Sequence, residues 1–162
     1  MDLLPFDEYV AQLPRKRMSA GVLLRSGDGR VLLVEPSYKP HWDIPGGSVD
    51  EGESPWATAA RELAEELGIK RDIFSLLVID HVAATDRMPE GLAFIFDGGV
   101  ISDEQVDALA LTDPEIVSVG LHRLDEAAGK LKPALARRLA VALDVAEHGG
   151  LALCDDGVRA KS

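Results

Sequence analysis

The chain has 162 residues, of which 46% are hydrophobic and 28% are charged, and its formal net charge is −11 at pH 7. This length suits one globular domain that buries a hydrophobic core, and the composition excludes wholesale disorder. The excess of acids argues against a nucleic-acid backbone as the main partner, because such binding needs clustered Lys and Arg. A small phosphorylated ligand remains compatible with it, since a bound divalent cation reverses the local charge.

Cysteine usage and the first residues indicate where the protein works. Cys154 is the only cysteine, so no internal disulfide can form and we expect a reducing compartment. Residues 1–17 carry early acids and no long apolar run, which is not the pattern of a signal peptide. No stretch approaches the roughly 18 apolar residues that span a bilayer. We therefore expect a cytoplasmic protein without a membrane partner.

Apolar runs alternate along the chain with helical patterns and turn signals. The alternation predicts an α/β fold in which a mixed β-sheet is sandwiched between helices. We expect, in chain order, a short helix over 5–12, strands over 18–25 and 30–36 joined by a hairpin-like loop, a helix over 55–67, strands over 74–84, 91–100 and 115–124, a short helix from Leu124, and an amphipathic helix over 133–147.

The helix over 55–67 has clear signals at both ends. Ser54 can cap its first turn, Pro55 suits the first helical position, and Gly68 suits the position just past its end. On a helical wheel, one apolar stripe is expected to pack on the sheet. The members of this stripe are Trp56, Ala59, Ala60, Leu63 and Leu67.

Three carboxylates, Glu62, Glu65 and Glu66, fall together on the neighbouring face of this helix. A solvated acidic face is the common reason for such a group. Like charges at spacings of three and four nevertheless cost about 0.2–0.5 kcal/mol each, and the helix dipole disfavours anions in the last turn by about 0.3–1 kcal/mol. A hard cation such as Mg²⁺ explains the group better, because it takes carboxylate oxygens and leaves positions for substrate phosphates.

Gly47, Glu53 and residues 61–69, RELAEELGI, together resemble a complete Nudix box. The family pattern is Gly-x5-Glu-x7-Arg-Glu-U-x-Glu-Glu-x-Gly-U, where U is a bulky aliphatic residue, and every specified position is matched from Gly47 to Ile69. The preceding WDIPGG is also similar to the family's usual lead-in.

The resemblance implies a Nudix-like α/β/α sandwich. It implies a single Nudix domain over 1–162, with an N-terminal extension over 1–16 and a C-terminal tail over 152–162. Family members often form dimers, so the resemblance allows a homodimer, although no residue of the sequence marks its interface.

In the family, the box holds divalent cations against a diphosphate. By this similarity Glu65 and Glu66 are the first expected metal ligands, Glu62 is the next, and the Gly47 carbonyl is a further candidate. The implied cofactor is Mg²⁺, with Mn²⁺ as an alternative.

The same similarity assigns catalytic roles. Arg61 and Glu53 match positions that usually pair and hold the loop against the helix, which would support the metal ligands. A general base must take the proton of the attacking water. Glu65 is the first candidate for this base. Asp113 and Glu115 are weaker candidates, because a turn acid and a surface acid at a strand start are common without any such role.

The activity implied by the box is metal-dependent hydrolysis of the pyrophosphate linkage in a nucleoside diphosphate joined to another group. Two alternatives share the fold. A catalytically silent nucleotide-binding sensor or scaffold usually loses box carboxylates, and all are retained here. Isopentenyl-diphosphate isomerase relies on a cysteine in its pocket, and none lies near this box. The implied partner is a small nucleotide, and the sequence does not identify which one.

The loop that enters the box contains three candidate substrate contacts. Lys39 and His41 could touch a phosphate, although loop residues of these types are more often simply exposed. Trp42 could stack on a base, whereas packing of the loop onto the core is the commoner role of such a residue.

Overall fold

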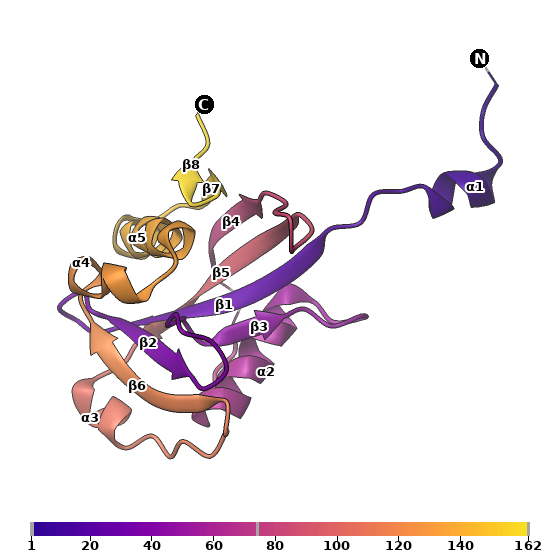
Figure 1. Ribbon diagram of the computed structural model, residues 1–162. Helices are drawn as coiled ribbons and strands as arrows, with labels where there is room; N and C mark the ends of the chain where they lie inside the picture. The colour runs from indigo at the N-terminus through magenta and orange to yellow at the C-terminus, as the bar shows by residue number, and fades with distance from the viewer. Residues whose placement is uncertain (1, 74, 162) are drawn as a thin grey trace.

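In the computed structural model, which describes residues 2–73 and 75–161, one mixed sheet lies between helices on its two faces (Figure 1). The helices are α1 (Phe6–Ala11), α2 (Pro55–Leu67), α3 (Asp103–Asp107), α4 (Leu124–Ala127) and α5 (Pro133–His148), and a 3₁₀ turn, η1 (Ala128–Lys130), follows α4. The strands are β1 (Arg17–Arg25), β2 (Val31–Pro36), β3 (Gly46–Ser48), β4 (Leu76–Val82), β5 (Gly91–Val100), β6 (Ile116–His122), β7 (Ala152–Asp155) and β8 (Val158–Arg159).

The strands follow the order β6-β2-β1-β5-β4-β7-β8, and β3 pairs with β1 beside this path. The β1–β5 and β4–β7 pairs are parallel, whereas the other pairs are antiparallel. The α/β/α sandwich expected from the sequence is therefore confirmed. Residue 74, where we expected a strand to begin, lies outside the described residues. The short elements α3 and β3 were not expected, because so few residues show no periodicity.

Alternate side chains of β1 point to two hydrophobic clusters, one on each face of the sheet. Leu23 packs in the cluster that α5 covers with Leu139, whereas Val22 and Leu24 pack in the cluster that α2 covers with Leu63. The two helices thus lie on opposite faces (Figure 1). Helices α2 and α5 therefore both pack against β1, each on one face of the sheet.

Helix α2 begins and ends where its signals predict, although its apolar stripe differs at one residue. The Ser54 hydroxyl accepts a hydrogen bond from the Ala57 N–H at 3.2 Å, and Gly68 adopts a left-handed φ of 69°. Trp56 was expected to pack on the sheet, but its side chain is 51% exposed. The buried position in the first turn belongs instead to Thr58, whose hydroxyl bonds to the Glu53 carboxylate and to the Ser54 carbonyl.

The segment expected to be a C-terminal tail is part of the sheet. β7 lies parallel to β4 and buries Ala152 and Cys154, and β8 turns back on β7. The Gly157 N–H also donates to the fully buried Asp80 carboxylate at 3.1 Å. The expectation of a tail over 152–162 is therefore wrong for residues 152–159. A strand of four residues is too short to give a clear strand signal, and its place is decided by the open edge of β4.

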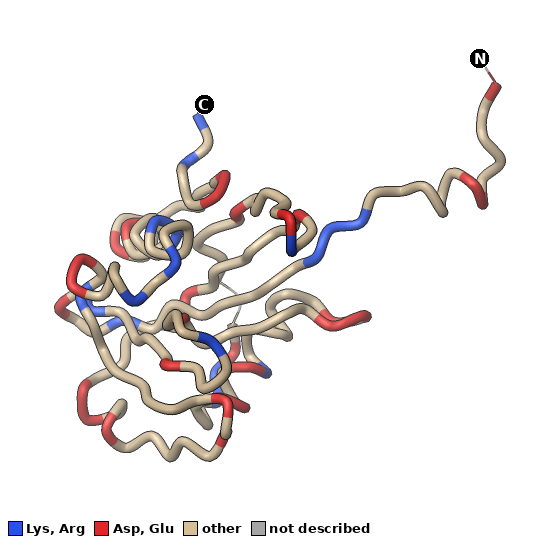
Figure 2. Tube along the Cα trace, viewed as in Figure 1, with Lys and Arg blue, Asp and Glu red and all other residues tan. Residues whose placement is uncertain are grey.

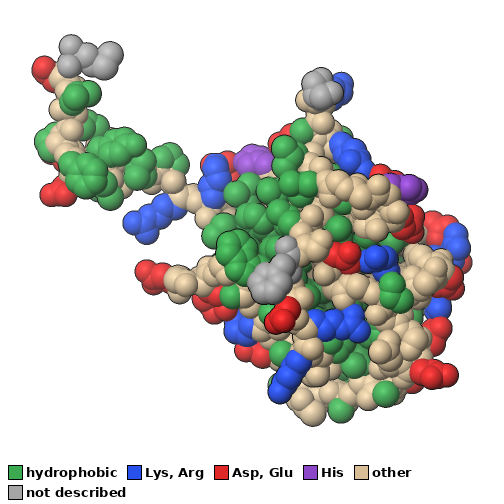
Figure 3. Space-filling view, turned by 180° about the vertical axis from the view of Figure 1, so that it is seen from behind, with side chains coloured by type: hydrophobic (Ala, Val, Ile, Leu, Met, Phe, Trp, Pro, Cys, Tyr) green, Lys and Arg blue, Asp and Glu red, His purple; other side chains and the backbone are tan. Residues whose placement is uncertain are grey.

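The first residues form an arm that stands clear of the body (Figures 1 and 3). No residue of α1 is buried, and apolar side chains such as Leu3 and Phe6 are exposed. Among the described residues, no helix is long and apolar enough to cross a membrane.

Removal of residues 152–162 is expected to destabilise the protein, because it uncovers β4 and takes one donor from buried Asp80. The lost hydrogen bond alone corresponds to about 1–3 kcal/mol. Urea denaturation followed by circular dichroism measures the change. Removal of only residues 161–162 is the control and should leave the midpoint unchanged. Equal midpoints for both truncations would show that this segment is a dispensable tail.

Candidate functional site

Two glycines let the loop before α2 lie close to β1 and to the helix. Gly47 stands opposite Ala20 in the β1–β3 pair. A Cβ atom on Gly46 would lie 2.3 Å from the Ala20 carbonyl oxygen, and one on Gly47 would lie 2.4 Å from a carboxylate oxygen of Glu62. Both distances are shorter than any real contact of a Cβ atom. Glycine at position 46 thus allows the loop to approach the β1 backbone, and glycine at position 47 allows the Glu62 carboxylate to pack against the loop.

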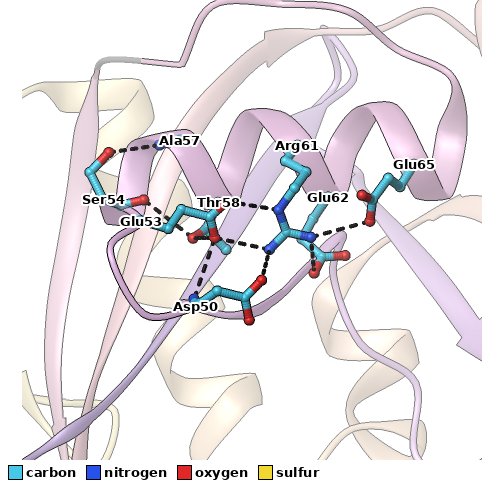
Figure 4. A network of polar contacts seen from close by, with 8 residues as sticks. All are labelled: Asp50, Glu53, Ser54, Ala57, Thr58, Arg61, Glu62 and Glu65. Carbon is cyan, nitrogen blue, oxygen red and sulfur yellow. Dashed lines mark hydrogen bonds and ion pairs between the residues drawn. The ribbon is translucent and has the colours of Figure 1, made fainter.

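The Arg61 guanidinium ties this loop to the helix (Figure 4). Its Nε and Nη2 donate to the two oxygens of Glu53 at 2.8 and 2.9 Å, and its Nη1 contacts Glu62 and Glu65 at 3.1 and 3.2 Å. The Glu53–Arg61 pair expected from the sequence is thus present. Hydrogen bonds from Arg61 and Thr58 lower the pKa of Glu53 to about 2, so this carboxylate stays ionised.

Glu66 is the buried carboxylate of the box. Its side chain is 7% exposed, and its Oε2 accepts one long hydrogen bond from the Gly46 N–H at 3.3 Å. Burial, and after it the neighbouring negative charge of Glu62, raises the pKa of Glu66 to about 8. Burial also raises the pKa of Glu62, and the charge of Arg61 opposes that rise. The buried Glu66 and the partly buried Glu62 therefore repel each other when both are ionised, although Glu62 also pairs with Arg61.

A cavity of about 1020 Å³ opens beside these carboxylates. Volumes of roughly 300–1,000 Å³ are typical of small-molecule sites. The sequence-predicted residues that line this cavity are Lys39, His41, Trp42, Gly47, Glu62, Glu66 and Glu115.

Glu65 and Asp113 do not line the cavity. The Glu65 side chain is 55% exposed and faces Arg61, while Asp113 accepts a hydrogen bond from the Glu115 N–H at 2.9 Å. Arg61 pairs with both Glu62 and Glu65, but of these two carboxylates only Glu62 lines the cavity together with Glu66. Accordingly, among residues 2–73 and 75–161 no three His, Cys, Asp or Glu side chains already converge as a metal site.

The loop residues before the box have structural partners as well as a place in the cavity wall. The Lys39 ammonium pairs with Asp43 at 2.7 Å. The Trp42 ring meets His122 edge-on at 5.0 Å between centroids, and the Lys130 ammonium lies 4.1 Å from the Trp42 centroid. Trp42 therefore packs the loop against η1 and β6 while one part of it faces the cavity.

The cavity wall also contains Arg87, Lys132 and Arg138, which the sequence did not mark. Arg87 comes from the loop between β4 and β5, whereas Lys132 and Arg138 come from the N-cap and the body of α5, so no local pattern joins the three. The one available signal was Asp80, an acid inside the apolar strand LLVIDHV, because a buried acid requires a partner.

The donor set suits a hard divalent cation. Glu62 and Glu66 present carboxylate oxygens to the cavity beside the Gly47 backbone, and Mg²⁺ binds through one or two carboxylates plus substrate phosphates. A cation there would stabilise the ionised form of Glu66, which burial disfavours. The residues present thus fit the metal that the sequence predicts.

The chain belongs to the NUDIX domain family, whose profile matches residues 15–143. An RNA pyrophosphohydrolase of Tolumonas auensis is 33% identical over 76 residues, which are 47% of this chain and 44% of that protein. The nucleoside diphosphate-linked moiety X motif 6 protein of Xenopus laevis is 45% identical over 62 residues, which are 37% of this chain and 29% of that protein. The chain spans less than half the length of both relatives.

Solved structures share the fold over most of the chain. The MutT protein from Methanosarcina mazei Go1 superposes with a TM-score of 0.66 at 25% identity, covering 85% of this chain and 99% of the other. The NUDIX domain of Shewanella oneidensis NrtR, complexed with ADP ribose, gives a TM-score of 0.64 at 20% identity, covering 87% and 98%. At this identity the second likeness shows the fold alone.

A double-mutant cycle with Glu53→Gln and Arg61→Gln tests how firmly the loop is held. We expect strong coupling between the two substitutions in the free energy of unfolding, because the pair is bidentate and only partly exposed. Urea denaturation of the four proteins measures it. The exposed pair Asp144–Arg159 serves as the control cycle, with coupling below about 1 kcal/mol. If the two cycles give equal coupling, the pair does not brace the box.

Proposed function

We propose that this protein hydrolyses the pyrophosphate linkage of a nucleoside diphosphate joined to another group, with Mg²⁺ or Mn²⁺ as cofactor. The observation that carries the proposal is the buried Glu66 carboxylate, which lies beside Glu62 at a cavity large enough for a nucleotide. The family supports the reaction class. So do the names of the relatives from Tolumonas auensis and Xenopus laevis, which refer to pyrophosphate hydrolysis and to diphosphate-linked nucleosides.

Glu62, Glu65, Glu66 and the Gly47 carbonyl are the proposed metal ligands. Glu66 now comes first, because it is buried and faces the cavity, whereas Glu65 would have to leave Arg61 to join it. When bound, the cation would neutralise the diphosphate and activate water for attack on phosphorus. Arg61 and Glu53 would act by position, since they hold the loop that presents Gly47.

The general base is proposed among three acids. Glu65 remains the first candidate, because it is exposed and lies next to Glu66 in the chain. Glu115 lies immediately before β6, lines the cavity and is the second candidate. Asp113 is the third, and its carboxylate accepts a hydrogen bond from the Glu115 N–H. Lys39, His41 and Trp42, in the loop that precedes the box, are proposed to contact the substrate. The buried free thiol of Cys154 agrees with a reducing, cytoplasmic location.

Replacement of Glu66 with Gln should abolish most hydrolysis while the protein stays folded. The bound metal is expected to stabilise the charge of the transition state by several kcal/mol. Without it, kcat/KM should fall more than about 100-fold. The rise in Tm on addition of Mg²⁺ should vanish as well, which reports on binding without turnover. Glu51→Gln changes an exposed loop acid and is the matched control. Unchanged turnover in the Glu66 variant would overturn the ligand assignment.

A panel of nucleoside diphosphate compounds, assayed with Mg²⁺ and Mn²⁺ and with phosphate release coupled to a phosphatase, tests the activity itself. We expect turnover of at least one member, and a loss of turnover in EDTA. Binding without turnover of any member would contradict hydrolysis and favour a nucleotide sensor.

A further inference from the structure

Helix α1, in the N-terminal arm over residues 2–16, has an apolar stripe that is exposed to solvent. Phe6, Tyr9 and Val10 lie at spacings of three and four residues, and Leu13 continues the stripe just beyond the helix. The side chain of Phe6 is 75% exposed and that of Tyr9 is 53% exposed. A helix with one apolar stripe normally buries that stripe against another element.

The length of α1 also indicates that the helix needs a partner. Isolated helices shorter than about 12–15 residues are only marginally stable in water, because the first turn costs more free energy than a few hydrogen bonds return. α1 has six residues, none of which is buried, and Figure 3 shows that the arm stands clear of the body. A surface that receives the stripe would stabilise the helix.

An apolar surface, which we call the open face, lies on the α2 side of the sheet. Ile79 of β4 stands opposite Phe94 of β5, and Leu153 of β7 stands opposite Ile79, so these three side chains share one face. Phe94 packs against the cluster under α2, which identifies the side. Figure 3 shows hydrophobic side chains gathered on the body beside the root of the arm. By strand alternation the open face comprises Ile79, Leu92, Phe94, Leu153 and Val158.

Strand β7 shows that the open face is not an ordinary solvated surface. Ala152 and Cys154 are buried in the cluster under α5, whereas Leu153, which points to the other side, is 56% exposed. A strand that faces water on one side normally carries polar residues there. Apolar side chains that gather in one exposed patch mark a site of interaction.

The chain before β1 directs the arm away from the open face of its own copy. Lys16 pairs with Glu90 at 2.6 Å, and the Arg17 Nε donates to the Pro89 carbonyl at 2.7 Å. Figure 2 shows this basic stretch at the root of the arm, beside the β4–β5 loop. Residues 13–16 contain no turn, and four extended residues carry α1 roughly 13 Å beyond the root. A second copy can receive the arm without any reversal of the chain.

We propose that the protein forms a two-fold dimer in which the stripe of each arm packs on the open face of the other copy. Both surfaces belong to one chain, so two reciprocal contacts close the assembly. Given their exposure, Phe6 and Tyr9 of two arms would bury roughly 500 Å². The receiving faces would lose a similar area, which brings the interface to the roughly 1,000 Å² of a biological contact. Leu153 does not line the cavity, so the exchange is independent of the proposed function.

Sedimentation equilibrium of the full chain tests the dimer. We expect the wild type to be dimeric, and Phe6→Asp combined with Tyr9→Asp to raise the dissociation constant more than about 100-fold, because aromatic anchors carry most of the energy of an interface. Leu153→Lys should do the same, since it would bury an unpaired charge. Val117→Lys is the matched control. Val117 is 57% exposed on β6, at the opposite edge of the sheet, so this variant should keep the wild-type constant. Thermal melts check that each variant is folded.

A mixture of the two variants separates arm exchange from other contacts. The arm variant, Phe6→Asp with Tyr9→Asp, keeps an intact open face, and the face variant, Leu153→Lys, keeps an intact arm. One contact of the proposed kind can therefore form between them. We expect the mixture to contain a heterodimer at concentrations at which neither variant dimerises alone.

A monomeric wild type would overturn the proposal and favour packing of the arm on its own chain. A dimer that persists in the arm variant would overturn it as well, because the bodies would then associate without the arms. The same conclusion follows if the mixture stays monomeric, or if the Val117 control loses the dimer.

Discussion

The contact between the Arg61 guanidinium and the Glu53 carboxylate holds the rest of the site in place. It joins the loop that contains Gly46 and Gly47 to the middle of α2. With the loop fixed, the Gly46 N–H meets the buried Glu66 carboxylate, and Glu62 packs against Gly47. Because Glu66 is buried beside Glu62, ionisation of both groups brings two like charges together. A bound divalent cation would relieve their repulsion, which would link the stability of the site to the chemistry we propose for it.

The charge distribution of the cavity extends this account across the sheet. Carboxylates of the box form one end, and the guanidinium of Arg138, fixed by Asp80, stands about three strands away. In a chain with an overall charge of −11, such a basic wall is a local feature built from β1, α5 and the β4–β5 loop.

Local patterns predicted the parts of the site that depend on neighbouring residues in sequence. Ser54, Pro55 and Gly68 set the ends of α2, and the spacing of Glu53 and Arg61 predicted their pairing. Long-range packing decided what the sequence could not predict. Thr58 is buried and bonded to Glu53, whereas Trp56 is exposed.

Tertiary context also decided three larger features. β7 is a strand because it pairs with the otherwise open edge of β4. The pairing of Asp80 with Arg138 joins residues 58 positions apart, and no periodicity reports it. Glu65 shares a helix face with Glu66 on a wheel, but Arg61 holds it outside the cavity. A helical wheel places side chains around an axis and does not include the groups that attract them.

The most direct test of the central claim is a crystal structure grown with Mn²⁺ and examined by its anomalous scattering. We expect a Mn²⁺ peak at the cavity within about 2.0–2.2 Å of a Glu66 carboxylate oxygen, as for a small octahedral cation. Ordered Mn²⁺ bound elsewhere, with Glu66 still bonded only to the Gly46 N–H, would contradict the account.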